Sequence, residues 1–128
     1  GNGGIIYPTS HSGRDALVGV GLFLTHYVSM GLKCSELLAT YPKFVIEKDK
    51  LDLPDNGVDQ ALQALIENHP EAKVNSIDGV KFDLDEGWVH LRRSNTEPII
   101  RVYAESDSAD SAKQLAGRFK AELLSLLS

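Results

Sequence analysis

The chain has 128 residues, of which 42% are hydrophobic and 24% are charged, which is enough for one domain with its own core. This composition excludes a disordered, collagen-like or low-complexity chain. The 13 basic and 18 acidic residues give a net charge of -5, so no overall positive field gathers nucleic acid or anionic lipid. An anionic ligand would therefore have to be held by a local group of donors.

The single cysteine and the short apolar stretches indicate in which cellular compartment the protein is expected. Cys34 stands alone, which excludes an internal disulfide framework and a cysteine-based zinc site and favours a reducing compartment. The longest apolar stretch, residues 16–24, is far shorter than the roughly 20 residues that cross a bilayer. No basic segment of a signal peptide precedes it. We therefore expect a cytoplasmic protein with no membrane partner.

The first third of the chain is predicted to be a loop followed by helices. Residues 1–13 are rich in glycine and small polar residues, which favours an irregular loop with at most a short strand. Residues 14–30 carry apolar side chains almost all around a helix, so this helix needs burial on several sides. Gly31 is typical of its end, and residues 35–39 predict a second, short helix.

These helices carry more apolar surface than so few residues can bury by themselves. The chain also begins at Gly1 rather than at a methionine. We therefore interpret residues 1–41 as the end of a preceding α/β domain, and the whole chain as a piece of a longer protein.

Residues 42–128 show the pattern of a compact mixed domain. Period-two alternation predicts strands and period-3.6 repeats predict helices, with Asp55 or Asn56 as the N-cap of the first helix and turns at residues 78–79 and 85–87. The elements expected in chain order are a strand at 44–53, a helix at 58–69, strands at 80–84, 88–92 and 99–104, and a helix from 108. This order predicts an α+β fold, an antiparallel sheet of about four strands with two helices on one face.

The segment between the last two strands, residues 92–98, is unusually dense in hydrogen-bond donors. An arginine fork, hydroxyls, an amide and backbone N–H groups can together surround a phosphate. These donors are Arg92, Ser94, Asn95 and Thr96. Glu97 would repel a bound anion, so we expect it to turn toward Arg101. From the residues alone, a polar hairpin tip whose arginines pair with nearby carboxylates explains the segment equally well.

Residues 92–103, Arg-Arg-Ser-Asn-Thr-Glu-Pro-Ile-Ile-Arg-Val-Tyr, resemble the phosphate-binding loop in the last domain of the α-D-phosphohexomutases. This family includes phosphomannomutase/phosphoglucomutase and phosphoglucosamine mutase. Residues 1–8 resemble the second half of the sugar-binding loop in the family's third domain, and residues 14–19 are similar to the helix start that follows it. The resemblance covers nearly the whole chain in the right order.

The resemblance implies roles for particular residues. Arg92, Ser94, Asn95 and Thr96 would hold the substrate phosphate that is not being transferred. Asn2 would contact a sugar hydroxyl. Separately, the place of Arg101 on the strand that leaves the loop favours a bracing role for it. The parent protein would interconvert hexose 6-phosphate and hexose 1-phosphate, of mannose, glucose or glucosamine, through a bisphosphate. Its partners would be the hexose phosphate and the N-terminal domains of the same enzyme.

The family's catalytic parts are expected outside this chain. The phosphorylated serine and the Asp-x-Asp-x-Asp magnesium loop have no counterpart in the sequence, so we expect no catalytic residue, no metal ligand and no bound cofactor here. Mg²⁺ would belong to the full-length parent, and the fragment alone would be inactive. Asp83 and Asp85 alternate but lack a third partner, and we interpret them as surface residues.

Other residues admit different interpretations. His90 suits a general base but is more simply a half-exposed strand residue, and His11 lies near the expected sugar loop. His26 and His69 show no partner by spacing. A rival class is an RNA-binding module that stacks bases on Trp88 and Tyr103, which the acidic balance disfavours. A structural or assembly role is the third alternative.

Overall fold

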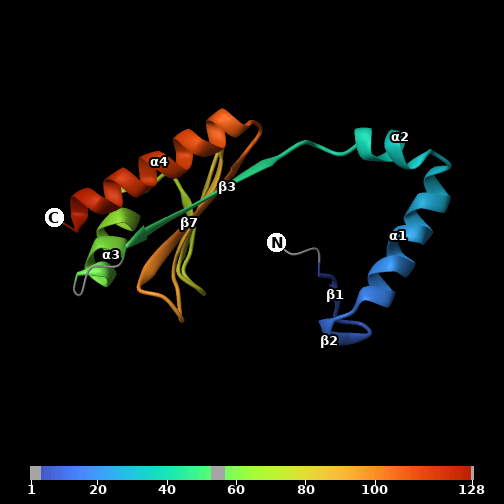
Figure 1. Ribbon diagram of the computed structural model, residues 1–128, viewed down its shortest axis with the longest axis horizontal. Helices are drawn as coiled ribbons and strands as arrows, with labels where there is room; N and C mark the ends of the chain where they lie inside the picture. The colour runs from blue at the N-terminus through green and yellow to red at the C-terminus, as the bar shows by residue number, and fades with distance from the viewer. Residues whose placement is uncertain (1–3, 53–56, 128) are drawn as a thin grey trace. The chain divides into compact units, whose positions relative to one another are not determined.

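A computed structural model describes residues 4–52 and 57–127 (Figure 1). The chain divides into two compact units, residues 1–42 and 43–128. Within the described residues, no helix has the length and apolar character needed to cross a membrane.

The first unit contains a small two-stranded sheet and two helices. Strands β1 (Ile6–Tyr7) and β2 (His11–Arg14) pair antiparallel, and helices α1 (Ala16–Met30) and α2 (Cys34–Ala39) follow. The sequence did not predict β2, because its polar residues and glycine lack apolar alternation. Asp15 caps α1 by accepting a hydrogen bond from the Val18 backbone at 3.0 Å. Gly31, with φ of 62°, ends α1 as predicted.

Helix α1 buries none of its residues within this unit. Leu17 is 85% exposed and Val28 is 77% exposed, although both are apolar. The expectation that this segment cannot bury its own apolar surface is therefore confirmed. Its assignment to the end of a preceding domain stays a prediction.

The second unit has the predicted α+β fold, with two helices and an antiparallel sheet. The elements are β3 (Val45–Asp52), α3 (Val58–Asn68), β4 (Lys73–Asn75), β5 (Val80–Leu84), β6 (Gly87–Arg93), β7 (Ile99–Ser106) and α4 (Ala109–Leu126). The strand order is β3-β7-β6-β5-β4, so the sheet has five strands rather than about four. The additional strand, β4, is too short to show alternation in the sequence.

Both helices of this unit pack into one core with the sheet. Phe82, Leu91 and Val102 are fully buried on the inner face of the strands. The predicted apolar stripe of α4 faces them and is buried throughout; it consists of Ala112, Leu115, Ala116, Phe119 and Leu123. Because side chains alternate along a strand, the residues between the buried ones are presented on the opposite face of the sheet.

One local prediction needs correction. The N-cap of α3 is Gly57, with φ of 86° and no side-chain cap, whereas Asp55 and Asn56 lie outside the described residues. A glycine takes this left-handed conformation without steric cost. Asp83, which was interpreted as a surface residue, contacts Lys81 of the same strand.

Sequence spacing indicated no partner for His26 or His69, but both rings have contacts in the structure. His69 contacts Glu71 at 3.0 Å and Glu122 at 2.9 Å, and it stacks on Phe119. Sequence spacing could not reveal the contact with α4, because Glu122 lies 53 residues further along the chain. The ring of His26 stacks with that of Tyr41 inside the first unit.

Candidate functional site

The outer faces of β6 and β7 present four polar side chains in two cross-strand pairs. Arg92 lies opposite Arg101, and His90 lies opposite Tyr103 in the antiparallel register. Directly opposed residues have Cβ atoms about 5 Å apart, and like charges in that position repel each other. An anion between the two opposed arginines would offset the repulsion between their positive charges, so this position favours anion binding.

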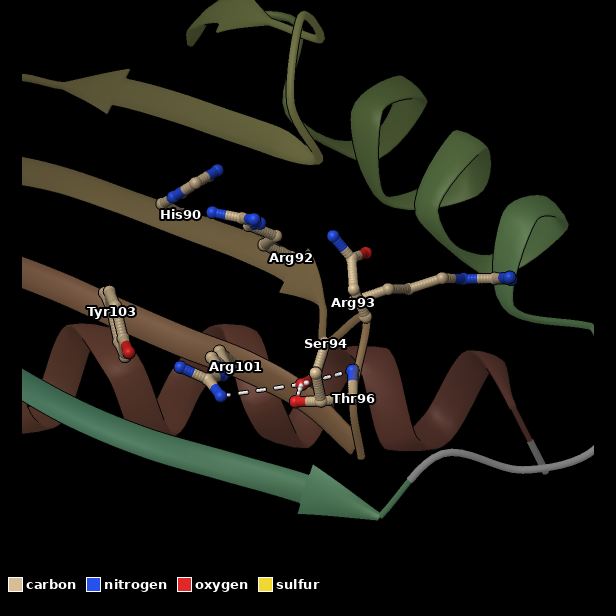
Figure 2. A pocket seen from close by; sticks show the side chains of 8 residues that line it. His90, Arg92, Arg93, Ser94, Thr96, Arg101 and Tyr103 are labelled. Atoms are coloured by element: carbon tan, nitrogen blue, oxygen red, sulfur yellow. Dashed lines mark hydrogen bonds between the residues drawn. The ribbon is translucent and has the colours of Figure 1, made fainter. Parts of the chain in front are cut away.

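These side chains line a cavity of about 290 Å³ at the end of the two strands (Figure 2). Its lining combines side chains of β6, β7 and the loop that joins them. The residues are His90, Arg92, Arg93, Ser94, Asn95, Thr96, Arg101 and Tyr103. The structure thus brings together all four predicted phosphate-contacting residues and Arg101. Asn2, the predicted sugar contact, lies outside the described residues.

The loop between β6 and β7 is closed by its backbone. The Ser94 N–H donates to the Ile99 carbonyl at 2.9 Å, and the Ile99 N–H donates to the Glu97 carbonyl at 2.8 Å. The contacts among the hydroxyls are long, since Ser94 Oγ lies 3.5 Å from both Thr96 Oγ1 and the Thr96 nitrogen. Asn95 forms no hydrogen bond or ion pair with any residue that the structure describes. The loop therefore gathers donors that its own contacts engage only weakly.

Arg101 connects the loop to the strand that leaves it. Its Nη2 lies 3.3 Å from Glu97 Oε2 and 3.5 Å from Ser94 Oγ, and Figure 2 shows the latter contact. Hydrogen bonding to Tyr103, followed by the charge of Glu97, raises the pKa of Arg101 above its ordinary value. Glu97 is directed toward Arg101 as the sequence predicted, which reduces its repulsion of an anion in the cavity.

The other two arginines of the loop region pair with carboxylates from different elements. Arg92 Nη1 lies 3.2 Å from Asp78 Oδ2, and Arg93 Nη2 lies 3.0 Å from Asp59 Oδ1 in the first turn of α3. Figure 2 shows Arg93 extending toward this helix. The carboxylate pairing considered for these arginines is therefore present. Because both pairs are exposed, each is worth about 0–1 kcal/mol and can be exchanged for a stronger anion contact.

A tight turn before β5 supports this side of the cavity. Gly79 has φ of 73°, and a Cβ at this position would overlap the carbonyl oxygen of Leu91 in β6. This close approach places Asp78 beside β6, where its carboxylate reaches Arg92 and its carbonyl accepts a hydrogen bond of 2.6 Å from His90 Nε2. The role of Asp78 could not be predicted from the sequence, because the contact depends on how one hairpin packs against the next strand.

His90 was considered as a general base or a half-exposed strand residue, and Tyr103 as a base-stacking residue of the RNA-binding alternative, but both line the cavity. Their two-residue spacing from Arg92 and Arg101 was the available signal, since it places all four on one face. Elsewhere, His11 contacts Asp15 at 3.0 Å within the first unit. Across the described residues, no group of three or more His, Cys, Asp or Glu side chains is placed to hold a metal ion.

Comparison with known proteins shows the family. Residues 50–122 match the family model of the phosphoglucomutase/phosphomannomutase C-terminal domain. The chain belongs to the phosphoglucomutase/phosphomannomutase family, and its second unit carries the family's C-terminal domain.

Individual relatives agree with this assignment. The chain is 31% identical over 120 residues to a probable phosphoglucosamine mutase of Methanopyrus kandleri, covering 92% of the chain and 26% of the relative. It is 34% identical over 116 residues to a phosphoglucomutase/phosphomannomutase of Thermococcus kodakarensis, and the match covers 88% of the chain and 25% of the relative. The chain thus spans about a quarter of the length of these relatives.

A solved structure supports the fold. The crystal structure of a phosphoglucomutase/phosphomannomutase family protein from Burkholderia thailandensis superimposes with a TM-score of 0.65 at 22% identity. The match covers 96% of this chain and 26% of that structure. At this identity the comparison supports the fold alone.

Proposed function

We propose that the cavity between β6 and β7 binds the phosphate group of a hexose phosphate. The observation that carries this proposal is the opposed pair of Arg92 and Arg101 at the mouth of a donor-rich loop. Two positive charges held side by side are stabilised by an anion, and the hydroxyls of Ser94 and Thr96 add donors to its oxygens.

Arg92 can bind phosphate without losing its contact with Asp78. A guanidinium group has five N–H donors, and the contact with Asp78 uses the Nη1 end at 3.2 Å. The remaining donors suit a planar, paired contact with two phosphate oxygens. Asp78 then fixes the direction of the side chain, which lowers the entropy that binding would otherwise cost.

Recognition of the phosphate group alone would suit a phosphohexomutase. An enzyme that moves a phosphoryl group between C1 and C6 through a bisphosphate needs one phosphate held while the other reacts. Because the donors of the loop would contact phosphate oxygens rather than the carbon that carries them, the loop would accept either phosphate after the sugar turns around. This proposal extends the mutase names of the relatives to the whole protein that contains this chain.

The chemical step is proposed to lie in other domains of the same protein. A magnesium ion bound there would neutralise charge on the phosphoryl group being transferred. The residues of this chain would bind, orient and shield the opposite end of the substrate. A cytoplasmic location and a partnership with the preceding domains follow from the same proposal.

RNA binding is less well supported, because the half-buried rings of Trp88 and Tyr103 already have partners. Lys48 Nζ lies over the ring of Tyr103 at 5.9 Å, and Lys81 Nζ lies over that of Trp88 at 5.2 Å. Trp88 also donates to Glu105 at 2.9 Å. One face of each ring is therefore occupied, which leaves less aromatic surface for stacked bases.

Titration of the ¹⁵N-labelled chain with glucose 1-phosphate and glucose 6-phosphate tests the proposal. Both ligands should shift the amide signals of residues 94–97 with similar, roughly millimolar affinity, because most other contacts of the substrate are missing. The chain should not interconvert the two compounds. Binding of only one isomer, or shifts confined to other residues, would contradict phosphate recognition at this loop.

A further inference from the structure

We propose that His90 and Tyr103 form a second compartment of the same cavity, which contacts the sugar next to the bound phosphate. This inference rests on the proposed function and extends it from the phosphate to the hexose. The pair lies directly across β6 and β7 and lines the cavity together with the phosphate loop. Figure 2 shows both rings further from the loop between β6 and β7 than Arg92 and Arg101.

The size of the cavity requires more than a phosphate to fill it. A water molecule occupies about 30 Å³ of liquid volume, so a phosphate group takes roughly two to three times that volume. The cavity measures about 290 Å³. The space beyond the phosphate is adjacent to the His90 and Tyr103 side chains, which makes them its nearest polar neighbours.

Strand geometry sets the distance between the two compartments. Successive residues on one face of a strand are about 6.5–7 Å apart, and this separates the His90–Tyr103 pair from the Arg92–Arg101 pair. A phosphate held at the arginine pair is therefore centred one strand repeat away from the backbone positions of His90 and Tyr103. Atoms attached to a phosphate at the arginines would lie beside the histidine and the tyrosine instead.

The hydrogen bond from His90 to the Asp78 carbonyl determines which ring nitrogen of His90 remains available to a ligand. Nε2 donates to the Asp78 carbonyl at 2.6 Å, so the neutral ring keeps Nδ1 as an acceptor. The Tyr103 hydroxyl accepts a hydrogen bond from Arg101 and keeps its own proton to donate. A sugar hydroxyl donates one hydrogen bond and accepts others, so it can donate to Nδ1 of His90 or accept from the Tyr103 hydroxyl.

Lysines flank this compartment on two sides, and the nearest carboxylate along β7, Glu105, accepts a hydrogen bond from Trp88. Lys81 lies opposite His90 on β5, but its ammonium group contacts Asp83 and lies over the Trp88 ring. On the other side, Lys48 lies over the Tyr103 ring. The compartment is thus polar and flanked by cations, which suits the hydroxyl-bearing part of a phosphorylated sugar.

The test compares inorganic phosphate with glucose 6-phosphate on two variants, Tyr103→Phe and His90→Ala. Each variant should weaken glucose 6-phosphate binding by about 3- to 10-fold, the effect of one lost hydrogen bond. Affinity for inorganic phosphate should stay within about twofold. Trp88→Phe, on the same face of β6 but outside the cavity lining, is the control and should change neither affinity.

The outcomes separate this inference from the proposed function. If wild-type chain binds neither ligand, phosphate binding itself is wrong, and the sugar compartment with it. If inorganic phosphate binds but both variants keep wild-type affinity for glucose 6-phosphate, the sugar compartment alone is refuted. Equal weakening of both ligands would assign the two residues to support of the phosphate loop, which also contradicts the inference. Amide spectra establish that each variant is folded.

Discussion

At the scale of single residues, the site depends on side chains that are each held by a neighbour from another element. Asp78 orients Arg92, and Arg101 lies between Glu97 and Ser94. The residue types in the loop could be predicted from the sequence as phosphate donors. The contact with Asp78 could not, because it requires a turn without a side chain at position 79 to approach the backbone of β6.

Gly79→Ala should destabilise the second unit by at least about 1–2 kcal/mol. The left-handed backbone disfavours any side chain by that amount, and the new Cβ would also overlap the Leu91 carbonyl. Gly117→Ala is the matched control, since Gly117 lies in helix α4 with no neighbouring atom within 4 Å of an added Cβ. It should stabilise by about 0.5–1 kcal/mol.

Urea unfolding monitored by circular dichroism measures both changes. Phosphate affinity of any folded Gly79→Ala protein should also fall, because the turn no longer places Asp78 beside Arg92. A Gly79→Ala variant as stable as wild type would show that the turn does not pack against β6 as described.

At the scale of elements, the spacing of apolar residues in the sequence was sufficient to predict strands β5, β6 and β7 and the buried stripe of helix α4. It was insufficient for β2 and β4, which are short and mostly polar, so they are strands only because a neighbour pairs with them. The joining of α3 to α4 through His69 was also missed. That contact is a matter of packing between helices far apart in sequence.

The His69 cluster makes the stability of the second unit depend on pH. Burial alone would lower the pKa of His69, but its hydrogen bonds to Glu71 and Glu122 outweigh burial and raise the pKa above the ordinary 6.5. The same contact lowers the pKa of Glu71, and hydrogen bonds from Asn68 and His69 lower that of Glu122 despite burial. Arg118 acts on both carboxylates in the same direction.

The stabilisation by His69 is therefore fully present below pH 6.5 and is lost as the pH rises through its raised pKa. The stabilisation by the two glutamates is present above pH 4.5 and is lost as the pH falls through their lowered pKa values. We expect the free energy of unfolding to be higher at pH 5.5 than at pH 8.5. The slope from His69 is at most about 1.4 kcal/mol per pH unit, because a single proton is released.

Denaturant titrations at several pH values check this dependence. His69→Gln should remove the decline between pH 5.5 and pH 8.5, whereas His26→Gln, in the first unit, should keep it. An unchanged decline in His69→Gln would assign the pH dependence to other groups.

At the scale of the whole molecule, the two units differ in how far they can stand alone. Every buried residue of the main core comes from the second unit, while Leu37 is the single buried hydrophobic residue among those described in the first. The cavity is also lined entirely by the second unit. The composition of residues 14–30 predicted this imbalance, because a helix apolar on nearly every side needs partners.

A chain of residues 43–128 should therefore fold cooperatively and keep the phosphate affinity of the full chain within about twofold. Residues 1–42 alone should show no cooperative unfolding, because they lack a core. Thermal unfolding and phosphate titration of the two pieces test this. Loss of phosphate binding in 43–128 would mean that the first unit contributes to the site.

The measurement that tests the central claim most directly is titration of the chain with inorganic phosphate, followed by the amide signals of residues 94–97. The wild-type chain and Arg118→Ala, which removes an exposed arginine of α4 paired with Glu86, should bind with roughly millimolar affinity. Arg92→Ala should bind at least about 10-fold more weakly, because the paired contact to two oxygens is lost. Wild-type affinity in Arg92→Ala would contradict the account.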